Sequence, residues 1–460
     1  MCYLRHSLCF VVILQWLRVW LGSRDRNPVC LSALTVSCPA DPVASPGRTC
    51  LLILHLLNPS GHHDILLVVV SYTCSQPSHA AAICSSTRYK FHRKDHLSPR
   101  EEPWPGVTIL KPLIGGDSLL ATNLESFFTM NYPLYEIMFC IQNANDPVIP
   151  LVNELVAKYP TIDTKVFIGG KKVGTNPKIN NLQPGYEAAK YDLIVVSDSC
   201  IRMKEDTLMD MVHNMTARVG LVHQMPFTCD RPGFVSVLEK VYFGTAHARI
   251  YMCASLLGIN CATGMSALMR KGPLDEAGGL RAFGCYLAED YFFAQTFLNR
   301  GYQLAVASTP ACQSADTGDV IGFQKRLIRW AKLRIAMVPF TILMEPVTEC
   351  LLLGALGALA ARCLLQVDLI VFYLLHVLFW FLLDWLMLSV VQNTSLPFNK
   401  FEFVVAWLLR EAYAPILFLR AIWDPVIRWR HGVFKLRWGG VAEEVPAPVP
   451  PADDAVKVKL

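Results

Sequence analysis

Three aspartates of this 460-residue chain lie where their carboxylates could act in catalysis. Asp146 follows the apolar run Tyr135–Ile141, Asp198 directly follows Leu193–Ser197, and Asp290 stands beside a second acid in a later segment. Taken singly, each aspartate is better explained as a turn or helix N-cap residue. Together they indicate more, because a carboxylate at a strand end can hold a divalent cation and a further carboxylate can take a proton from a hydroxyl group.

A nucleotide-sugar donor needs such a divalent cation, because negative charge builds up on its diphosphate leaving group. A fourth element is the segment Arg326-Leu327-Ile328-Arg329-Trp330, in which cations and an indole adjoin the predicted membrane region. The neighbouring Lys325 and Lys332 instead fit a basic helix that faces solvent and lipid headgroups.

The elements that must position these residues alternate between strand and helix patterns from Val107 onward. Short apolar runs separated by helices predict a mainly parallel sheet that is covered on both faces. Ligands of such sheets bind beyond the carboxyl ends of the strands, which is where the aspartates lie. The predicted strands are Val107–Leu110, Tyr135–Ile141, Thr164–Phe167 and Leu193–Ser197, and the predicted helices are Leu119–Phe128, Leu151–Lys158 and Asp206–Thr216.

The composition excludes a chain that is soluble throughout, because 53% of its residues are hydrophobic and only 17% are charged. The net charge of +5 is too small to indicate a nucleic-acid partner. Val347–Gln366 and Leu369–Val391 are each long enough to cross a lipid bilayer. Phe403–Trp423 has Arg410 and Glu411 at its centre and better fits an interfacial or re-entrant helix.

Four regions follow from these patterns. Residues 1–104 are irregular and are interpreted as a weak membrane anchor and a linker. Residues 105–335 form the predicted cytosolic catalytic domain, and residues 336–427 form transmembrane and interfacial helices. Residues 428–460 are a basic cytosolic tail whose proline-rich end is predicted to be disordered.

The cysteines number 16, but their positions do not indicate a disulfide scaffold or a zinc site, since no CxxC pair occurs. Clusters of basic residues on both sides of the apolar C-terminal region mark the cytosolic side of a membrane. Thiols in the cytosol are kept reduced, so we predict free cysteines.

The order Asp146, Asp198, Glu289-Asp290 and Arg326-x-x-Arg329-Trp330 resembles the D, D, D, (Q/R)xxRW pattern of membrane-bound inverting glycosyltransferases of the GT-A, family 2 type. Within that group the chain is most similar to the members that glucosylate ceramide. The resemblance covers about residues 104–445 and is strongest in longer segments. These include residues 110–113, 167–174, 176–181, 220–223, 241–245 and 263–266.

The resemblance implies a role for each of the acidic residues. Asp146 binds the uridine part of UDP-glucose. Asp198 holds a divalent cation, Mg²⁺ or Mn²⁺, as the first acid of a reduced DxD motif in which Cys200 replaces the last acid. Asp290 is the general base, which takes the proton of the primary hydroxyl of ceramide as that hydroxyl attacks the anomeric carbon.

The resemblance also implies binding roles for basic and aromatic residues. Arg326, Arg329 and Trp330 hold the diphosphate and shape the acceptor site. Two histidines, His223 and His247, are candidate substrate-binding residues through the resemblance, with a structural role as the alternative. Lys171, Lys172 and Lys178 lie in a glycine-containing loop that could contact phosphate, although a solvated loop explains them equally well.

The implied reaction transfers glucose from UDP-glucose to ceramide with inversion, which is the first step of glycosphingolipid synthesis. The expected location is a Golgi membrane, with several spans and the catalytic domain facing the cytosol. A polysaccharide synthase, another lipid-linked glycosyltransferase and a catalytically silent membrane scaffold are the alternatives. The choice of glucose over galactose rests on the resemblance, and the sequence leaves the oligomeric state open.

Overall fold

The computed structural model describes residues 91–92, 102–316, 318–340, 342, 349–429 and 432–445. All of them belong to one compact unit, Gly61–Leu460. The predicted anchor around Cys9–Leu21 and the proline-rich tail after Val445 lie outside the described residues.

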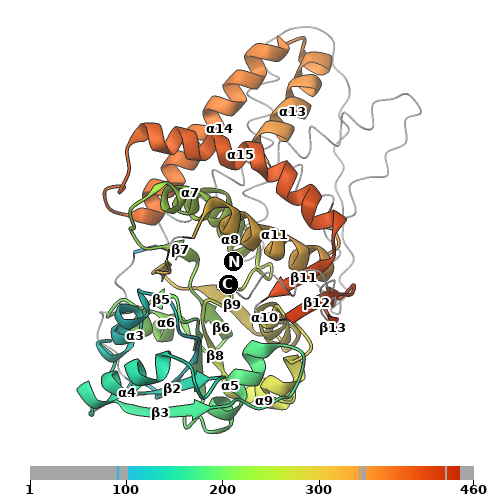
Figure 1. The fold of residues 1–460 in the computed structure, drawn as a ribbon. Helices are drawn as coiled ribbons and strands as arrows, with labels where there is room; N and C mark the ends of the chain where they lie inside the picture. The colour runs from blue at the N-terminus through green and yellow to red at the C-terminus, as the bar shows by residue number, and fades with distance from the viewer. Residues whose placement is uncertain are drawn as a thin grey trace, which may run out of the picture. The chain divides into compact units, whose positions relative to one another are not determined.

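A seven-stranded sheet with the order β3-β2-β1-β4-β8-β6-β9 forms the centre of the catalytic domain (Figure 1). Only β8 runs antiparallel to its neighbours in this sheet. The predicted mainly parallel α/β fold is therefore confirmed. Its strands are β1 (Val107–Leu113), β2 (Tyr135–Ile141), β3 (Asp163–Ile168), β4 (Leu193–Ser197), β6 (Val219–His223), β8 (Ser266–Arg270) and β9 (Gln303–Val306).

Helices cover both faces of the sheet because successive strand side chains point to opposite faces. Ile109 and Phe139 share a core with α3, α4 and α6, whereas Leu110 and Met138 share another with α5 and α10. The helices of this domain are α3 (Leu120–Phe128), α4 (Val148–Lys158), α5 (Pro177–Glu187), α6 (Thr207–Asn214), α9 (Lys271–Glu276), the 3₁₀ helix η5 (Leu280–Phe283) and α10 (Glu289–Asn299).

The predicted strands Tyr135–Ile141 and Leu193–Ser197 agree with β2 and β4 at every residue. Strand β1 continues three residues beyond the predicted end at Leu110. Lys111 explains the difference, because it is fully buried in β1 and its ammonium group donates a hydrogen bond to the Asp198 carbonyl at 2.6 Å. A strand can continue through a lysine when the buried charge has such a partner.

A second, three-stranded sheet corrects the prediction of reduced cysteines for one pair, whereas the seven other cysteines of the described residues are free as predicted. It contains β5 (Ile201–Arg202), β10 (Ala311–Gln313) and β7 (Pro226–Thr228), and a disulfide joins Cys229 to Cys312. Because β7 and β10 pair side by side, they bring the two Cα atoms to 5.0 Å, within the range that a disulfide spans. The two cysteines are 83 residues apart in sequence, so their spacing gave no sign of this pairing.

The remaining helices lie on one side of the main sheet in Figure 1, with α7, α8 and α11 between that sheet and α13–α15. They are α7 (Phe234–Tyr242), the π-helix η4 (Phe243–His247), α8 (Ala248–Leu257), α11 (Val320–Met337), α13 (Cys350–Leu365), α14 (Leu369–Gln392) and α15 (Lys400–Trp423). Within the described ranges, α14 alone is long and apolar enough to cross a membrane, and 17% of its most apolar window is buried. Helix α13 has 16 residues, or roughly 24 Å, which is shorter than the predicted span Val347–Gln366.

Charged residues within the apolar helices pair with one another inside the protein. Asp384 of α14 is fully buried and accepts hydrogen bonds from Arg410 at 2.9 Å and from the Trp407 indole at 2.8 Å. Arg410 also contacts Glu411 and donates to the Thr245 hydroxyl of η4. This pairing explains how α15 carries two adjacent charges at its centre, because buried charges require partners of opposite sign.

The chain after α15 returns to the catalytic domain as a small antiparallel sheet, which the sequence did not predict. The sheet consists of β11 (Val426–Trp429), β12 (Gly432–Leu436) and β13 (Ala442–Val445). Alternate apolar residues of these strands are buried, among them Ile427, Phe434 and Leu436. The basic residues that alternate with these apolar residues led to the prediction of a basic cytosolic tail.

Candidate active site

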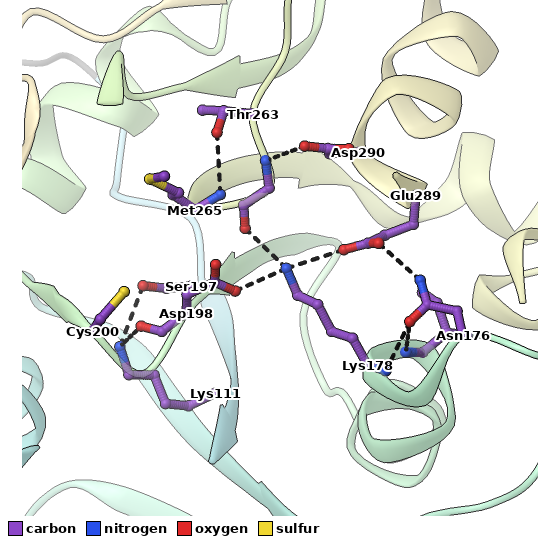
Figure 2. Close-up of polar contacts among 12 residues, drawn as sticks. Lys111, Asn176, Lys178, Ser197, Asp198, Cys200, Thr263, Met265, Glu289 and Asp290 are labelled. Atoms are coloured by element: carbon purple, nitrogen blue, oxygen red, sulfur yellow. Dashed lines mark hydrogen bonds and ion pairs between the residues drawn. The ribbon is translucent and has the colours of Figure 1, made fainter. Parts of the chain in front are cut away.

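A buried lysine, Lys178, joins the segments that carry two of the three predicted aspartates. Its ammonium group lies 2.8 Å from an Asp198 carboxylate oxygen and 3.0 Å from a Glu289 carboxylate oxygen (Figure 2). It also donates a hydrogen bond to the Gly264 carbonyl at 3.1 Å. Burial alone would lower the pKa of Lys178, but Asp198 and Glu289 raise it above its usual value, so the side chain remains a cation.

The start of helix α5 explains why Lys178 points into this cluster. Asn176 is the N-cap and accepts a hydrogen bond from the Lys178 backbone N–H at 2.8 Å, while Pro177 occupies the first helical turn. The amide group of Asn176 donates to the Tyr286 carbonyl at 2.7 Å and to a Glu289 carboxylate oxygen at 2.8 Å. One cap residue thereby aligns the start of α5 with the start of α10.

Asp290 lies in the first turn of α10 and accepts hydrogen bonds from the backbone N–H groups of Gly264 at 2.5 Å and Tyr291 at 2.9 Å. Burial, and then the neighbouring Glu289, raise the pKa of Asp290 to about 6, although Lys178 and the two backbone donors oppose the rise. A Cβ at position 264 would stand 3.1 Å from the Asp290 carboxylate and 3.2 Å from the Lys178 ammonium, so a larger residue there would displace both groups slightly. A carboxylate with such a pKa is suited to accept a proton near neutral pH.

The raised pKa of Asp290 predicts a pH dependence of the reaction. A general base must be unprotonated, so kcat/KM is expected to be level above about pH 7 and to fall about tenfold per unit below the Asp290 pKa of about 6. Initial rates between about pH 5 and pH 8 at low substrate concentration test this. A rate that stays level down to about pH 5 would contradict the assignment of Asp290 as the base.

Asp198 stands at the carboxyl end of β4, about one-third exposed, as predicted. Its backbone carbonyl accepts from Lys111, whose pKa is lowered to about 7 because the side chain is fully buried. Cys200 stands where a second acid is expected, and burial raises the pKa of its thiol to about 11. Cys200 is therefore a neutral thiol, which leaves Asp198 as the one acid of this motif.

Asp146 lies in the loop after β2 and forms its hydrogen bonds with neighbouring backbone groups. One of its carboxylate oxygens accepts hydrogen bonds from the backbone N–H groups of Gly115 and Val148, both at 2.9 Å. A Cβ at position 115 would stand 2.6 Å from that oxygen, so this loop requires glycine there. The contacts of Asp146 are those of a loop-ordering residue at the carboxyl edge of the sheet.

The basic and aromatic segment lies on α11, where Trp330 stacks in parallel on the His247 ring with centroids 5.9 Å apart. Arg326 donates to Glu239 at 2.8 Å, and its guanidinium lies over the Trp330 ring at 5.4 Å. Arg329 lies over the Trp429 ring at 6.0 Å. Each of these three predicted residues is therefore held by an aromatic partner.

The two predicted histidines are buried and lie around Tyr251 of α8. The His247 ring centroid is 4.8 Å from that of Tyr251, and the His223 ring centroid is 5.8 Å from it. Burial, followed by Arg334 and Arg326, lowers the pKa of His247 to about 3. His247 is therefore neutral at physiological pH and contributes an aromatic surface rather than a charge for phosphate.

Lys171 and Lys172 lie in an exposed loop that is bonded to helix α5, where the Lys171 N–H donates to the Asn180 carbonyl at 2.8 Å. Lys171 forms a surface ion pair with Glu187 at 2.8 Å. Such exposed pairs contribute little stability, and this arrangement fits the alternative of a solvated loop.

Sequence reasoning placed Asp198 and Asp290 in the site but assigned no role there to Asn176, Lys111 or Glu289, and only a general phosphate contact to Lys178. The segment Asn176-Pro177-Lys178 carried a usable signal, because Asn followed by Pro is typical of a helix start. The partners of Lys178 lie 20 and 111 residues further along the chain, so only the fold reveals that it meets both acids.

The sequence of this chain is similar to those of known proteins. The model of a family described as "Glycosyl transferase family 21" matches residues 75–442. "Ceramide glucosyltransferase 3" of Caenorhabditis elegans is 42% identical over 380 residues, which cover 82% of this chain and 82% of that protein. "Ceramide glucosyltransferase 1" of the same organism is 40% identical over 354 residues, covering 76% of each chain.

Among solved structures, a mannosyltransferase from Pyrobaculum calidifontis in complex with GDP-Man and Mn²⁺ is similar to this chain. Its identity is 16% and its TM-score is 0.44, over 78% of this chain and 99% of that one.

Proposed function

The chain belongs to glycosyl transferase family 21, and from this membership we propose that it transfers glucose from UDP-glucose to the primary hydroxyl of ceramide. The product is β-glucosylceramide, the first intermediate of glycosphingolipid synthesis. The observation that carries the catalytic part of the proposal is the part-buried Asp290 carboxylate, which accepts from the Gly264 N–H beside the Lys178 cluster that reaches Asp198. The acceptor and donor are proposed from the names of the two nematode relatives.

Asp290 performs the proton transfer. Its carboxylate takes the proton of the ceramide hydroxyl as the hydroxyl oxygen forms a bond to the anomeric carbon of glucose. The bond between that carbon and the diphosphate oxygen breaks at the same time, and UDP leaves with both bonding electrons. A single displacement of this kind inverts the anomeric carbon and produces a β-linked glucose.

Asp198 is the residue that would hold a divalent cation, Mg²⁺ or Mn²⁺, together with the donor diphosphate. Its carboxylate is part-exposed, and no group of three or more His, Cys, Asp or Glu side chains within the described ranges could hold a metal ion by itself. One carboxylate plus substrate phosphates is a usual arrangement for magnesium, so the residues present fit the cation. When bound, the cation would offset the negative charge of the leaving diphosphate.

The remaining predicted residues bind the substrates in this proposal. Asp146 orders the loop at the carboxyl edge of the sheet where the uridine is expected, with Gly115 and Val148 as its partners. Arg329 and Arg326 hold the diphosphate, and Trp330 with His247 forms an aromatic wall for the acceptor.

The lipid acceptor implies a membrane enzyme, and α14 supports this by its length and apolar surface. We place the chain in a Golgi membrane with its catalytic domain in the cytosol. The donor site is then open to UDP-glucose from the cytosol. The region 336–427 then presents ceramide from the bilayer to Asp290.

Membranes from cells that lack glucosylceramide synthesis provide the test. The full chain is expressed in these cells, and the membranes receive UDP-glucose, magnesium or manganese, and a fluorescent ceramide. A β-glucosylceramide product that is absent with Asp290→Asn supports the proposal. Well-expressed, membrane-inserted protein that makes no such product would overturn the ceramide assignment, and a parallel reaction with UDP-galactose tests the choice of sugar.

A further inference from the structure

The small sheet β11–β13 contacts the segment that leads into the catalytic base. Tyr286 and Val441 form an antiparallel bridge, and the Ala442 N–H donates to the Cys285 carbonyl at 2.9 Å. Glu289 and Asp290 begin α10 only a few residues later. A segment that follows the last apolar helix is therefore hydrogen-bonded to the loop of the proposed active site.

The same loop is held from its other side by the N-cap of α5. The Tyr286 carbonyl accepts from Asn176 at 2.7 Å, and the Tyr286 ring stacks on Phe292 of α10 with centroids 3.6 Å apart. The loop before Asp290 is thus fixed between the start of α5 and the strand β13. Neither contact can be lost without freeing one side of the loop.

The small sheet also contacts helix α11, which carries the proposed diphosphate-binding arginines. Trp429 of β11 lies under the Arg329 guanidinium at 6.0 Å. Lys332 donates to Asp424 at 3.0 Å and to the Val426 carbonyl at 2.7 Å. A common core joins the sheet, the loop and the helix, and it consists of Leu287, Ala336, Ile427, Phe434, Leu436 and Ala442.

The turn between β12 and β13 reaches both catalytic segments. Gly440 has a φ of +83°, and a Cβ there would stand 2.9 Å from Met337 and 3.0 Å from Phe292. The preceding Gly439 donates its N–H to the Ala336 carbonyl at 2.9 Å. Glycine is required at 440 both for the backbone conformation and for this close approach.

We propose that the sheet β11–β13 is a positioning element of the active site, which orients Arg329 through Trp429 and the loop before Asp290 through Ala442. This inference rests on the proposed function for the roles of Arg329 and Asp290. Only Asp424 and Pro425 separate α15 from β11, so the sheet also fixes the end of an apolar helix against the catalytic loop. Its residues are positioning residues and do not touch the reacting atoms.

Three tryptophan variants of the full chain in detergent test the contact with Arg329. Trp429→Leu removes the ring under the guanidinium and is expected to raise the Kd for UDP, and the KM for UDP-glucose, by about three- to tenfold, the range of a cation–π contact. Trp429→Phe keeps an aromatic face and is expected to stay within about twofold of the wild type. Trp438→Leu is the matched control, because Trp438 follows β12 but is 68% exposed.

A backbone variant tests the contact with the loop. Ala442→Pro removes the N–H that bonds to Cys285 and is expected to lower kcat at least tenfold while the Kd for UDP stays within twofold. If Trp429→Leu does not fold, Trp429→Met, which is unbranched and has no ring, repeats the first test. UDP affinity and kcat near wild-type values in both variants would overturn the inference, as would equal losses in Trp429→Phe and Trp429→Leu.

Direct UDP binding separates this inference from the proposed function. A wild-type chain that binds UDP but makes no glucosylceramide contradicts the ceramide assignment alone. In that case the change in UDP affinity on Trp429→Leu still decides whether the sheet positions Arg329.

Discussion

Replacing Asp290 by asparagine is expected to lower kcat by about 10²–10⁴-fold, the contribution of a positioned general base. The amide of asparagine keeps the shape of the side chain and can still accept from the Gly264 N–H, but it cannot take a proton from the acceptor hydroxyl. The KM for UDP-glucose should change little, because the proposal assigns Asp290 to the acceptor hydroxyl and not to the donor. Steady-state rates of glucosylceramide formation by purified protein in detergent measure both values.

Asp163→Asn is a matched control for this substitution. Asp163 begins the edge strand β3, and its carboxylate pairs with Lys190 on the surface, so its loss should leave kcat unchanged and stability within about 0.5 kcal/mol. The residual activity of Asp290→Asn should also lose the acidic limb of the pH profile. A variant that keeps a third or more of wild-type kcat would exclude Asp290 as the base.

Replacing Lys178 by methionine is expected to have the second large effect, on stability as well as on activity. The change leaves Asp198, Glu289 and Asp290 without their shared buried cation, and breaking a buried ion pair by removing one partner costs about 3–5 kcal/mol. We also expect kcat to fall at least tenfold, since the contacts that hold Asp198 and Glu289 in place are lost. Thermal unfolding in detergent and initial rates measure the two effects.

Lys178→Arg separates charge from shape at this position. It keeps the cation, so it should retain more stability than Lys178→Met, although the planar guanidinium cannot copy all three contacts of the ammonium. Lys158→Met serves as the control, because Lys158 forms an exposed pair with Glu125. Wild-type stability and kcat in Lys178→Met would show that the cluster has no role in either.

Much of the fold could be predicted because its strands are short apolar runs with clear ends. The strands β2 and β4 were located at every residue. The resemblance to the glycosyltransferases that glucosylate ceramide is confirmed by membership in glycosyl transferase family 21 and by the two nematode relatives. Strand β8 was not predicted, since Ser266–Arg270 has no alternation to mark it. Its antiparallel place between β4 and β6 is set by pairing with strands distant in sequence.

The candidate site could be predicted in part, for a related reason. Asp198 directly follows strand β4, and Asp290 lies in the first turn of helix α10. The residues next to them in sequence are therefore enough to place both at the end of a regular element. The proline that follows Asn176 indicates that Asn176 is a helix cap. Its side-chain hydrogen bond to the Tyr286 carbonyl joins residues 110 positions apart, so the sequence gives no sign of it. The disulfide between Cys229 and Cys312 and the return of β11–β13 to the Asp290 loop are likewise contacts between distant segments.

The sequence alone determined the chemistry that this protein has available: three acids at strand and helix ends, arginines beside an aromatic residue, and apolar helices that follow them. These features are local, because residue type and the period of an apolar pattern decide them. Only the tertiary structure decided that Lys178 joins two acids and that a basic tail is a sheet packed against the catalytic loop. Burial and charge pairing depend on which distant segments pack together, and the spacing of residues along the chain does not reveal which segments these are.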